Sequence, residues 1–139
     1  MKNTATIILN RNLPNETDLL VEHLSTFDGN HTDIYVVEAG SDREKLSKYC
    51  TWHVTTPEVM SQGLRYSRGM NYGLLELWKS GSWRKYDSFF LLTNDTKFPI
   101  NQKTISTLHM IMKKYPRLGI IFPCSDRWGE KGLIGKKSL

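Results

Sequence analysis

The chain contains few cysteines and lacks any long apolar run. Its only cysteines, Cys50 and Cys124, come with no CxxC spacing and no Cys/His cluster. We therefore expect two free thiols in a reducing compartment, and neither a structural disulfide nor a zinc site. No apolar run approaches the roughly 20 residues that span a bilayer, and the apolar stretch near the N-terminus is too short for a signal peptide. The chain is therefore expected to be cytoplasmic.

Several motifs of nucleotide-binding and nucleic-acid-binding proteins are also missing. No G-x-G-x-x-G follows the first predicted strand, which argues against a dinucleotide fold of the usual kind, and the absence of G-x-x-x-x-G-K-[ST] excludes a P-loop. No aromatic RNA-binding motif, zinc finger or clear helix-turn-helix pattern stands out. Nucleic acid is therefore not the expected partner.

The composition is that of an ordinary globular domain. Hydrophobic residues make up 39% and charged residues 24% of the 139 residues, which is typical of globular proteins, and this length can bury a core as a single domain over residues 1–139. The 19 Lys and Arg residues outnumber the 14 Asp and Glu residues, which gives a net charge of +5. The excess is dispersed apart from a basic, glycine-containing tail at residues 127–139, so we interpret most of it as solvated surface.

Apolar segments of strand length alternate with segments of helical periodicity along the chain. The predicted strands are residues 4–9, 33–37, 51–55, 87–92 and 118–122. Helices are predicted at about residues 16–27, after a loop through Gly63 up to about residue 80, and after Asn101, which we expect to cap the third helix. This alternation predicts an α/β fold with three layers, in which a mainly parallel sheet of about five strands has helices on both faces.

Polar and acidic residues recur directly after these strands. They are Asn10, Arg11, Asn12, Glu38, Ser41, Asp42, Asn94, Asp95, Ser125 and Asp126. Parallel strands end at one edge of a sheet, and ligands bind there at the point where the strand order reverses, which we expect between the first and fourth strands. The pattern predicts a crevice with carboxylates for ribose hydroxyls, base edges or a metal, and with an arginine for phosphate.

The stretch at residues 88–99 carries this pattern most clearly. Phe89 to Leu92 form a continuous apolar run, as in a strand buried on both faces. The run stops at Asn94 and Asp95, where the carboxylate of Asp95 could ligate a hard cation such as Mg²⁺ or Mn²⁺. The alternative is a simple turn, because both side chains form local hydrogen bonds readily.

Five short motifs, taken in order, resemble the donor-binding half of a family 2 glycosyltransferase with the GT-A fold, in the nucleotide-diphospho-sugar transferase superfamily. Asn10-Arg11-Asn12 is similar to the polar turn after the first strand of that family. Residues 36–42, Val-Val-Glu-Ala-Gly-Ser-Asp, resemble its V-V-D-N-G-S-x-D segment. Residues 68–73, Arg-Gly-Met-Asn-Tyr-Gly, resemble R-x-x-N-x-G, residues 92–96 resemble the D-x-D region, and residues 118–123 resemble its fifth strand.

The resemblance implies a glycosyltransferase that binds a UDP-, GDP- or dTDP-linked sugar with Mg²⁺ or Mn²⁺ and transfers the sugar with inversion. It implies that Asp95 holds the metal and that the nucleotide sugar is bound by Asn10, Arg11, Asn12, Glu38, Ser41, Arg68 and Asn94. Glu38 replaces the usual Asp, and Asn94 stands where an acid is common. The acceptor-binding half of the family, which carries its catalytic base, would lie beyond residue 139, so the base is not identified.

The same residues also allow simpler interpretations. Glu38 could be an exposed turn residue before Gly40, and Arg68 a solvated arginine on a helix. The alternative function is a catalytically incomplete nucleotide-binding module of the same fold. A domain that docks nucleic acid or an acidic partner through its basic tail fits less well, because acidic strand ends would repel phosphates unless a metal intervened.

Overall fold

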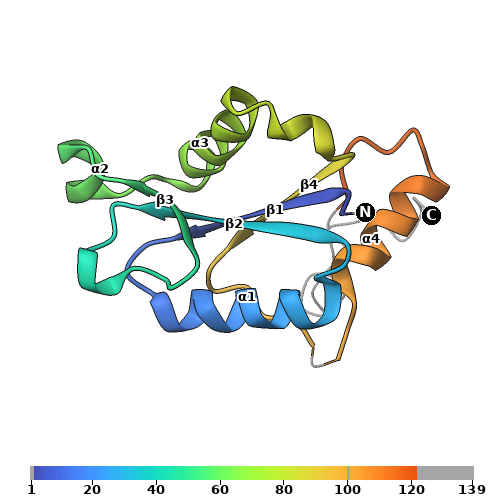
Figure 1. Ribbon diagram of the computed structural model, residues 1–139, viewed down its shortest axis with the longest axis horizontal. Helices are drawn as coiled ribbons and strands as arrows, with labels where there is room; N and C mark the ends of the chain where they lie inside the picture. The colour runs from blue at the N-terminus through green and yellow to red at the C-terminus, as the bar shows by residue number, and fades with distance from the viewer. Residues whose placement is uncertain (1, 100, 122–139) are drawn as a thin grey trace, which may run out of the picture. The chain divides into compact units, whose positions relative to one another are not determined.

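The computed structural model describes residues 2–99 and 101–121 of the chain (Figure 1). Contacts divide the chain into a unit up to Ser106, which contains the whole sheet, and a unit from Thr107 onward. The elements are β1 (Thr4–Asn10), α1 (Pro14–Asp28), β2 (Thr32–Ala39), the 3-10 turn η1 (Arg43–Lys45), β3 (Cys50–Val54), α2 (Pro57–Gln62), α3 (Tyr66–Lys79), the 3-10 turn η2 (Ser82–Lys85), β4 (Ser88–Thr93) and α4 (Thr104–Lys114).

The four strands form one parallel sheet in the order β3-β2-β1-β4. From β1 the chain moves to β2 and then β3 on one side, and it returns to place β4 on the other side of β1. The strand order therefore reverses between β1 and β4, as the sequence predicts. Because every strand runs in the same direction, their carboxyl ends meet at one edge.

The sheet is the middle layer of three, with α1 on one face and α2 and α3 on the other (Figure 1). All seven residues of β1 are buried. Successive side chains of a strand point to opposite faces of the sheet, so β1 packs against both helical layers. Ile7 packs with Met70 and Leu77 of α3, whereas Ile8 packs with Leu20 and Leu24 of α1. Full burial of an aliphatic side chain of this size contributes about 1.5–3 kcal/mol to the stability of the fold. The prediction of helices on both faces of the sheet is confirmed.

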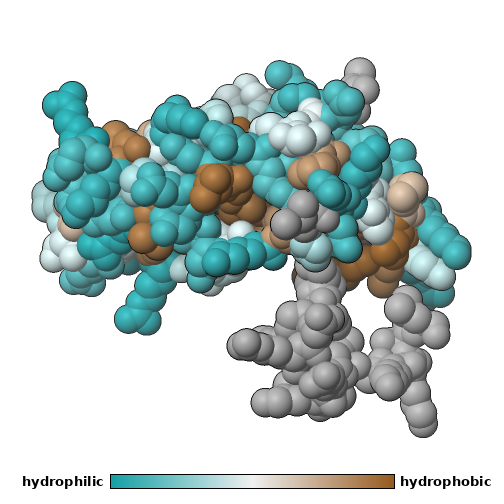
Figure 2. Space-filling view, turned by 90° about the horizontal axis from the view of Figure 1, so that it is seen from below, coloured by the Kyte–Doolittle hydropathy of each residue, from teal (hydrophilic) through white to brown (hydrophobic). Residues whose placement is uncertain are grey.

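The exposed face on the α1 side is mainly hydrophilic, with small separate hydrophobic patches (Figure 2). In the described part of the chain, no helix combines the length and the apolar character needed to cross a membrane. Cys50 is exposed and its thiol is free, whereas Cys124 and the tail at residues 127–139 lie outside the described residues.

The predicted five-stranded sheet is wrong in its strand number. The described part of the fifth predicted strand, Leu118 to Ile121, is not a strand. A turn at Pro116 and Arg117 precedes it, and Ile120 is 83% exposed. An apolar, β-branched run forms a strand only when it can pair with a neighbouring strand and bury its side chains. The run from Leu118 to Ile121 is paired with no strand of the sheet.

The glycines before and within α3 have packing roles. Residues 57–62, which the sequence places in a loop, form the short helix α2, and Gly63 ends it at a φ of 70°. A Cβ atom on Gly69 would lie 2.3 Å from a methyl carbon of Leu9, and one on Gly73 would lie 2.8 Å from a methyl carbon of Ile7. These two glycines therefore let α3 lie close against β1, which offsets their low helix propensity.

The first turn of α4 is capped by a residue from the end of α1. The sequence predicts that Asn101 caps this helix, but the carboxylate of Asp28 accepts hydrogen bonds from the backbone N–H groups of Thr104, Ile105 and Ser106 at 2.9, 3.1 and 3.0 Å. Asp28 is 1% exposed. The carboxylate satisfies three of the four N–H groups that a helix start leaves unpaired.

Candidate functional site

The carboxyl ends of β1, β2 and β4 bring most of the predicted site residues together at one edge of the sheet. We call this edge the rim, and it consists of residues 10–12, 38–42 and 94–95. Asn10 lies opposite Glu38 in the ladder between β1 and β2, and Leu9 lies opposite Thr93 in the ladder between β1 and β4. The position of the rim follows from the parallel sheet and from three strands that end at nearly the same level.

Glu38 is the buried centre of the rim. Its side chain is 0% exposed, and its two oxygens accept hydrogen bonds from Asn10 Nδ2 at 3.0 and 2.9 Å, from Ser41 Oγ at 2.5 Å and from the backbone N–H of Ser47 at 2.8 Å. An ionised carboxylate only accepts hydrogen bonds, and each of these partners can donate. Glu38 therefore fixes the loop after β2 and is not the exposed turn residue of the simpler interpretation.

Asn10 joins Glu38 to the end of β4. Its Nδ2 donates to Glu38, and its Oδ1 accepts from Asn94 Nδ2 at 2.7 Å and from the backbone N–H of Leu13 at 3.3 Å. Asn10 is 0% exposed. One amide side chain thus links three adjacent strand ends, and it lies where the strand order reverses.

Asn12 and the loop after β2 hold each other in place. The backbone N–H of Asn12 donates to Ser41 Oγ at 3.1 Å, and Asn12 Oδ1 accepts from the backbone N–H of Asp42 at 2.8 Å. Asn12 has a φ of 57°, a conformation that Asn tolerates better than most residues. Ser41 is 0% exposed, so Asn12 and Ser41 shape the rim from within.

Two residues of the network carry no motif that would identify them in the sequence. Ser47 donates its backbone N–H to Glu38, and His53 Nε2 lies 2.9 Å from the carbonyl oxygen of Ser41. His53 lies opposite Glu38 in the ladder between β2 and β3. Its place at the end of a strand is the signal that could have suggested it, whereas a backbone donor such as Ser47 leaves no mark in a sequence.

The two arginines of the predicted site contact α2. Arg11 Nη2 donates to the carbonyl oxygens of Met60 and Ser61 at 3.3 and 3.2 Å. Arg68 Nη1 lies 3.0 Å from Glu58 Oε1, and both of these side chains are about 60% exposed, at 61% and 60%. The predicted site thus has a buried part around Glu38 and an exposed part that carries the positive charge.

Asp42 adds a further charge beside Arg11. A hydrogen bond from Lys45 at 2.8 Å and its positive charge hold the pKa of Asp42 below its usual range, and the charge of Arg11 adds to this. Nearly half of each side chain is exposed, 44% for Asp42 and 49% for Lys45, so solvent weakens this pair.

Asp95 follows β4 and is exposed. It forms no hydrogen bond or ion pair within the described residues, and its neighbour Asn94 uses Nδ2 to contact Asn10, which leaves Asn94 Oδ1 available. No group of three or more His, Cys, Asp or Glu side chains in the described ranges could hold a metal. The available oxygens therefore suit a cation that takes one carboxylate from the protein and further oxygens from a ligand.

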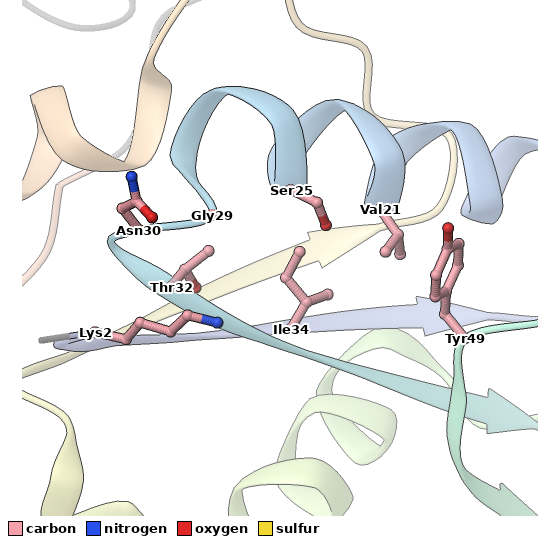
Figure 3. Close-up of a pocket in the computed structure, with 8 residues that line it drawn as sticks. All are labelled: Lys2, Val21, Ser25, Gly29, Asn30, Thr32, Ile34 and Tyr49. Carbon is pink, nitrogen blue, oxygen red and sulfur yellow. The ribbon is translucent and has the colours of Figure 1, made fainter.

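A pocket of about 440 Å³ lies elsewhere, between α1 and the first half of β2 (Figure 3). Ile34 is one of the residues that line this pocket, and Lys2 is the charged residue of the lining. Lys2 Nζ lies 3.0 Å from a carboxylate oxygen of Asp33, so this charge already has a partner. No rim residue lines the pocket, and we do not include it in the candidate site.

No protein-family model, no curated protein and no solved structure matches this chain. What the candidate site binds must therefore be inferred from its own side chains, those of the rim together with Arg68. These are a buried network centred on Glu38, two exposed arginines that contact α2, and the exposed carboxylate of Asp95.

Proposed function

We propose that the rim binds the nucleotide diphosphate of a sugar donor together with Mg²⁺ or Mn²⁺, as the donor-binding part of a GT-A glycosyltransferase. The observation that carries this proposal is the side-chain bridge from Glu38 through Asn10 to Asn94. It joins the two strand ends that the motif resemblance assigns to the nucleoside and to the metal, at the point where the strand order reverses.

The network around Glu38 and the exposed arginines have different roles in binding. Glu38, Asn10, Asn12 and Ser41 hold the loops after β1 and β2 in shape, and the nucleoside lies against the surface that these loops present. Arg11 and Arg68, which are exposed, are the cations available to the phosphates, because a guanidinium binds phosphate in a bidentate manner.

Asp95 and Asn94 Oδ1 are the oxygens that would hold the cation. A bound Mg²⁺ or Mn²⁺ would neutralise negative charge on a departing nucleotide diphosphate. One protein carboxylate is enough for a cation that takes its other ligands from phosphates and water, so the donor set fits the cation. In the unliganded protein Asp95 is exposed and free to bind it.

Binding and sugar transfer are separate parts of the proposal. No side chain at the rim is identified as a general base, which must reach the proton it removes. Turnover of a nucleotide sugar by this chain would support a glycosyltransferase, whereas metal-dependent binding without turnover would support the catalytically incomplete nucleotide-binding module.

Calorimetric titration with UDP in the presence of Mn²⁺ tests the binding step. We expect Asp95→Ala to weaken binding at least about tenfold and to remove its dependence on Mn²⁺, because a metal ligand is lost. Asp87→Ala is the matched control, since Asp87 is also exposed but lies next to the opposite end of β4. Unchanged affinity of Asp95→Ala, or equal losses in both variants, would refute the assignment. GDP and dTDP replace UDP in parallel titrations.

A further inference from the structure

We propose that α2 is a displaceable strap, which occupies Arg11 and Arg68 in the unliganded protein and is released when a phosphate-type anion takes its place. The strap is residues 56–63. This inference concerns the regulation of the rim, and it rests on the proposed function only in taking the diphosphate as the natural anion. The contacts of the strap are independent of that function.

Arg11 holds the carboxyl end of the strap. Its guanidinium donates to the carbonyl oxygens of Met60 and Ser61, which belong to the last turn of α2. The last carbonyl groups of a helix lack partners within the helix and carry partial negative charge, so a cation is favourable there. Arg11 therefore acts as a cap for α2 although it lies directly after β1.

Arg68 holds the other end of the strap. Its guanidinium lies 3.0 Å from the carboxylate of Glu58, in the first turn of α2. The pair is about 60% exposed on both sides, and exposed ion pairs contribute little to stability. This contact fixes the position of α2 but is easily exchanged for another anion.

The strap has few other attachments. Within α2 only Val59 is buried, at 4% exposure, and its backbone packs against Gly40, while Met60 is 37% exposed. A helix of six residues is not stable without such contacts. Gly63, with a φ of 70°, lets the chain leave α2 sharply, and its missing side chain leaves the space that Arg11 fills, since a Cβ atom there would lie 2.7 Å from Arg11 Nη1.

A phosphate oxygen is a stronger partner for Arg11 than the carbonyl oxygens of the strap. The two hydrogen bonds from Arg11 to neutral carbonyl oxygens are long, at 3.3 and 3.2 Å. A guanidinium can bind a phosphate through two parallel hydrogen bonds between opposite charges, which neutral carbonyl oxygens do not offer. An anion bound at Arg11 therefore removes the cap of α2, and a second oxygen at Arg68 replaces Glu58.

Hydrogen–deuterium exchange of the strap tests this inference with inorganic pyrophosphate, in the absence of metal and nucleotide. The reporters are the N–H groups of Met60 and Gly63, which donate to the carbonyl oxygens of Thr56 and Val59. We expect pyrophosphate to speed exchange of residues 58–63 about fivefold, and Arg11→Ala to give a similar increase without pyrophosphate and no further response to it.

Arg43→Ala is the matched control, because Arg43 is exposed in η1 and no hydrogen bond or ion pair joins it to α2 in the described part of the chain. It should exchange and respond like the wild type. Glu58→Gln, which keeps the size of the side chain and removes its charge, should give a smaller increase, and a far-UV circular dichroism spectrum checks that each variant is folded. Wild-type exchange in Arg11→Ala, or no response of the wild type to pyrophosphate, would overturn the strap.

The outcome separates the strap from the proposed function. If pyrophosphate and Arg11→Ala both release α2 while UDP with Mn²⁺ does not bind, the strap stands and the proposed function fails. If UDP with Mn²⁺ binds, and neither pyrophosphate nor Arg11→Ala changes the hydrogen exchange of α2, the proposed function stands and the strap fails.

Discussion

The side-chain amide of Asn10 contacts both carboxylate oxygens of Glu38, at 3.0 and 2.9 Å, across two neighbouring parallel strands. Both side chains are 0% exposed. A buried carboxylate is tolerated only when its hydrogen bonds are complete, so this pair is a requirement for folding as well as a part of the rim. Variants of the rim must therefore be tested for stability before they are tested for binding.

Glu38→Gln should lower the free energy of unfolding by about 2–3 kcal/mol, because the new NH₂ group faces donors that previously met an acceptor. Urea denaturation followed by circular dichroism measures the change. Glu44→Gln is the control, since Glu44 is exposed in η1 and should change stability by less than about 0.5 kcal/mol. Equal stability of Glu38→Gln and the wild type would mean that Glu38 does not organise the loop.

Gly40→Ala should destabilise the protein more than Gly81→Ala, by the cost of displacing α2, although both glycines have a positive φ, of 79° and 73°. A Cβ atom on Gly40 would lie 2.1 Å from the carbonyl oxygen of Val59, whereas one on Gly81 would meet nothing within 4 Å. We expect about 1–2 kcal/mol for Gly81→Ala, from backbone strain alone. Urea unfolding of both variants makes the comparison, and similar losses would show that α2 can move away from Gly40 at no cost.

Asp28→Ala should destabilise the protein by about 2 kcal/mol, since it removes the cap of α4 and leaves three backbone N–H groups without their acceptor. Hydrogen exchange of residues 104–106 should also become faster, which distinguishes a lost cap from a general loss of stability. Asp28→Asn keeps one acceptor oxygen and should lie between the wild type and Asp28→Ala. Unchanged exchange at residues 104–106 in Asp28→Ala would contradict the capping role.

Folding stability should fall above about pH 10 because of Tyr86. Burial raises the pKa of the Tyr86 phenol well above its usual value, and hydrogen bonds with Tyr35 at 2.6 Å and Asp33 at 2.7 Å add to the shift. The unfolded chain then loses this proton near pH 10 while the folded chain keeps it. Because the folded state binds more protons there, stability decreases as the pH rises.

Urea unfolding at pH 8 and at pH 10.5 measures this effect in the wild type and in Tyr86→Phe. The variant should lose less stability between the two pH values, since it has no phenol to ionise. It should also be less stable at pH 8, because it lacks the two hydrogen bonds. Parallel pH profiles in both proteins would assign the alkaline loss to other groups.

Much of the sheet could be predicted from local patterns. The apolar runs of β1 and β4 and the polar residues after them indicate buried parallel strands, and the reversal of strand order between β1 and β4 is confirmed. The prediction of a strand at residues 118–121 is wrong, because an apolar run indicates that side chains tend to be buried but does not show that a partner strand is present. The short helix α2 was missed because six residues are too few to show a helical period.

The candidate site could be predicted as a set of positions but not as a set of contacts. The strand-end rule placed Glu38 beside Asn10 and Asn94, yet it could not tell a buried carboxylate from an exposed one. That distinction depends on donors such as the backbone N–H of Ser47, which the loop between β2 and β3 brings back to Glu38. In the same way, Arg11 was recognised as a cation at the rim, but its carbonyl partners in α2 depend on the path of the chain after β3.

The segment that carries Asp95 is anchored at both ends. The segment that carries Asp95 begins at Asn94, which is bound to Asn10 just before α1, and ends at Thr104, which is bound to Asp28 at the far end of α1. The 15 residues of α1 extend about 22 Å, while the ten residues from 94 to 103 can reach at most about 35 Å. About 13 Å of reach therefore remains, so Asp28 fixes where α4 begins without drawing the segment taut, and Asp95 is positioned by its anchored neighbour Asn94.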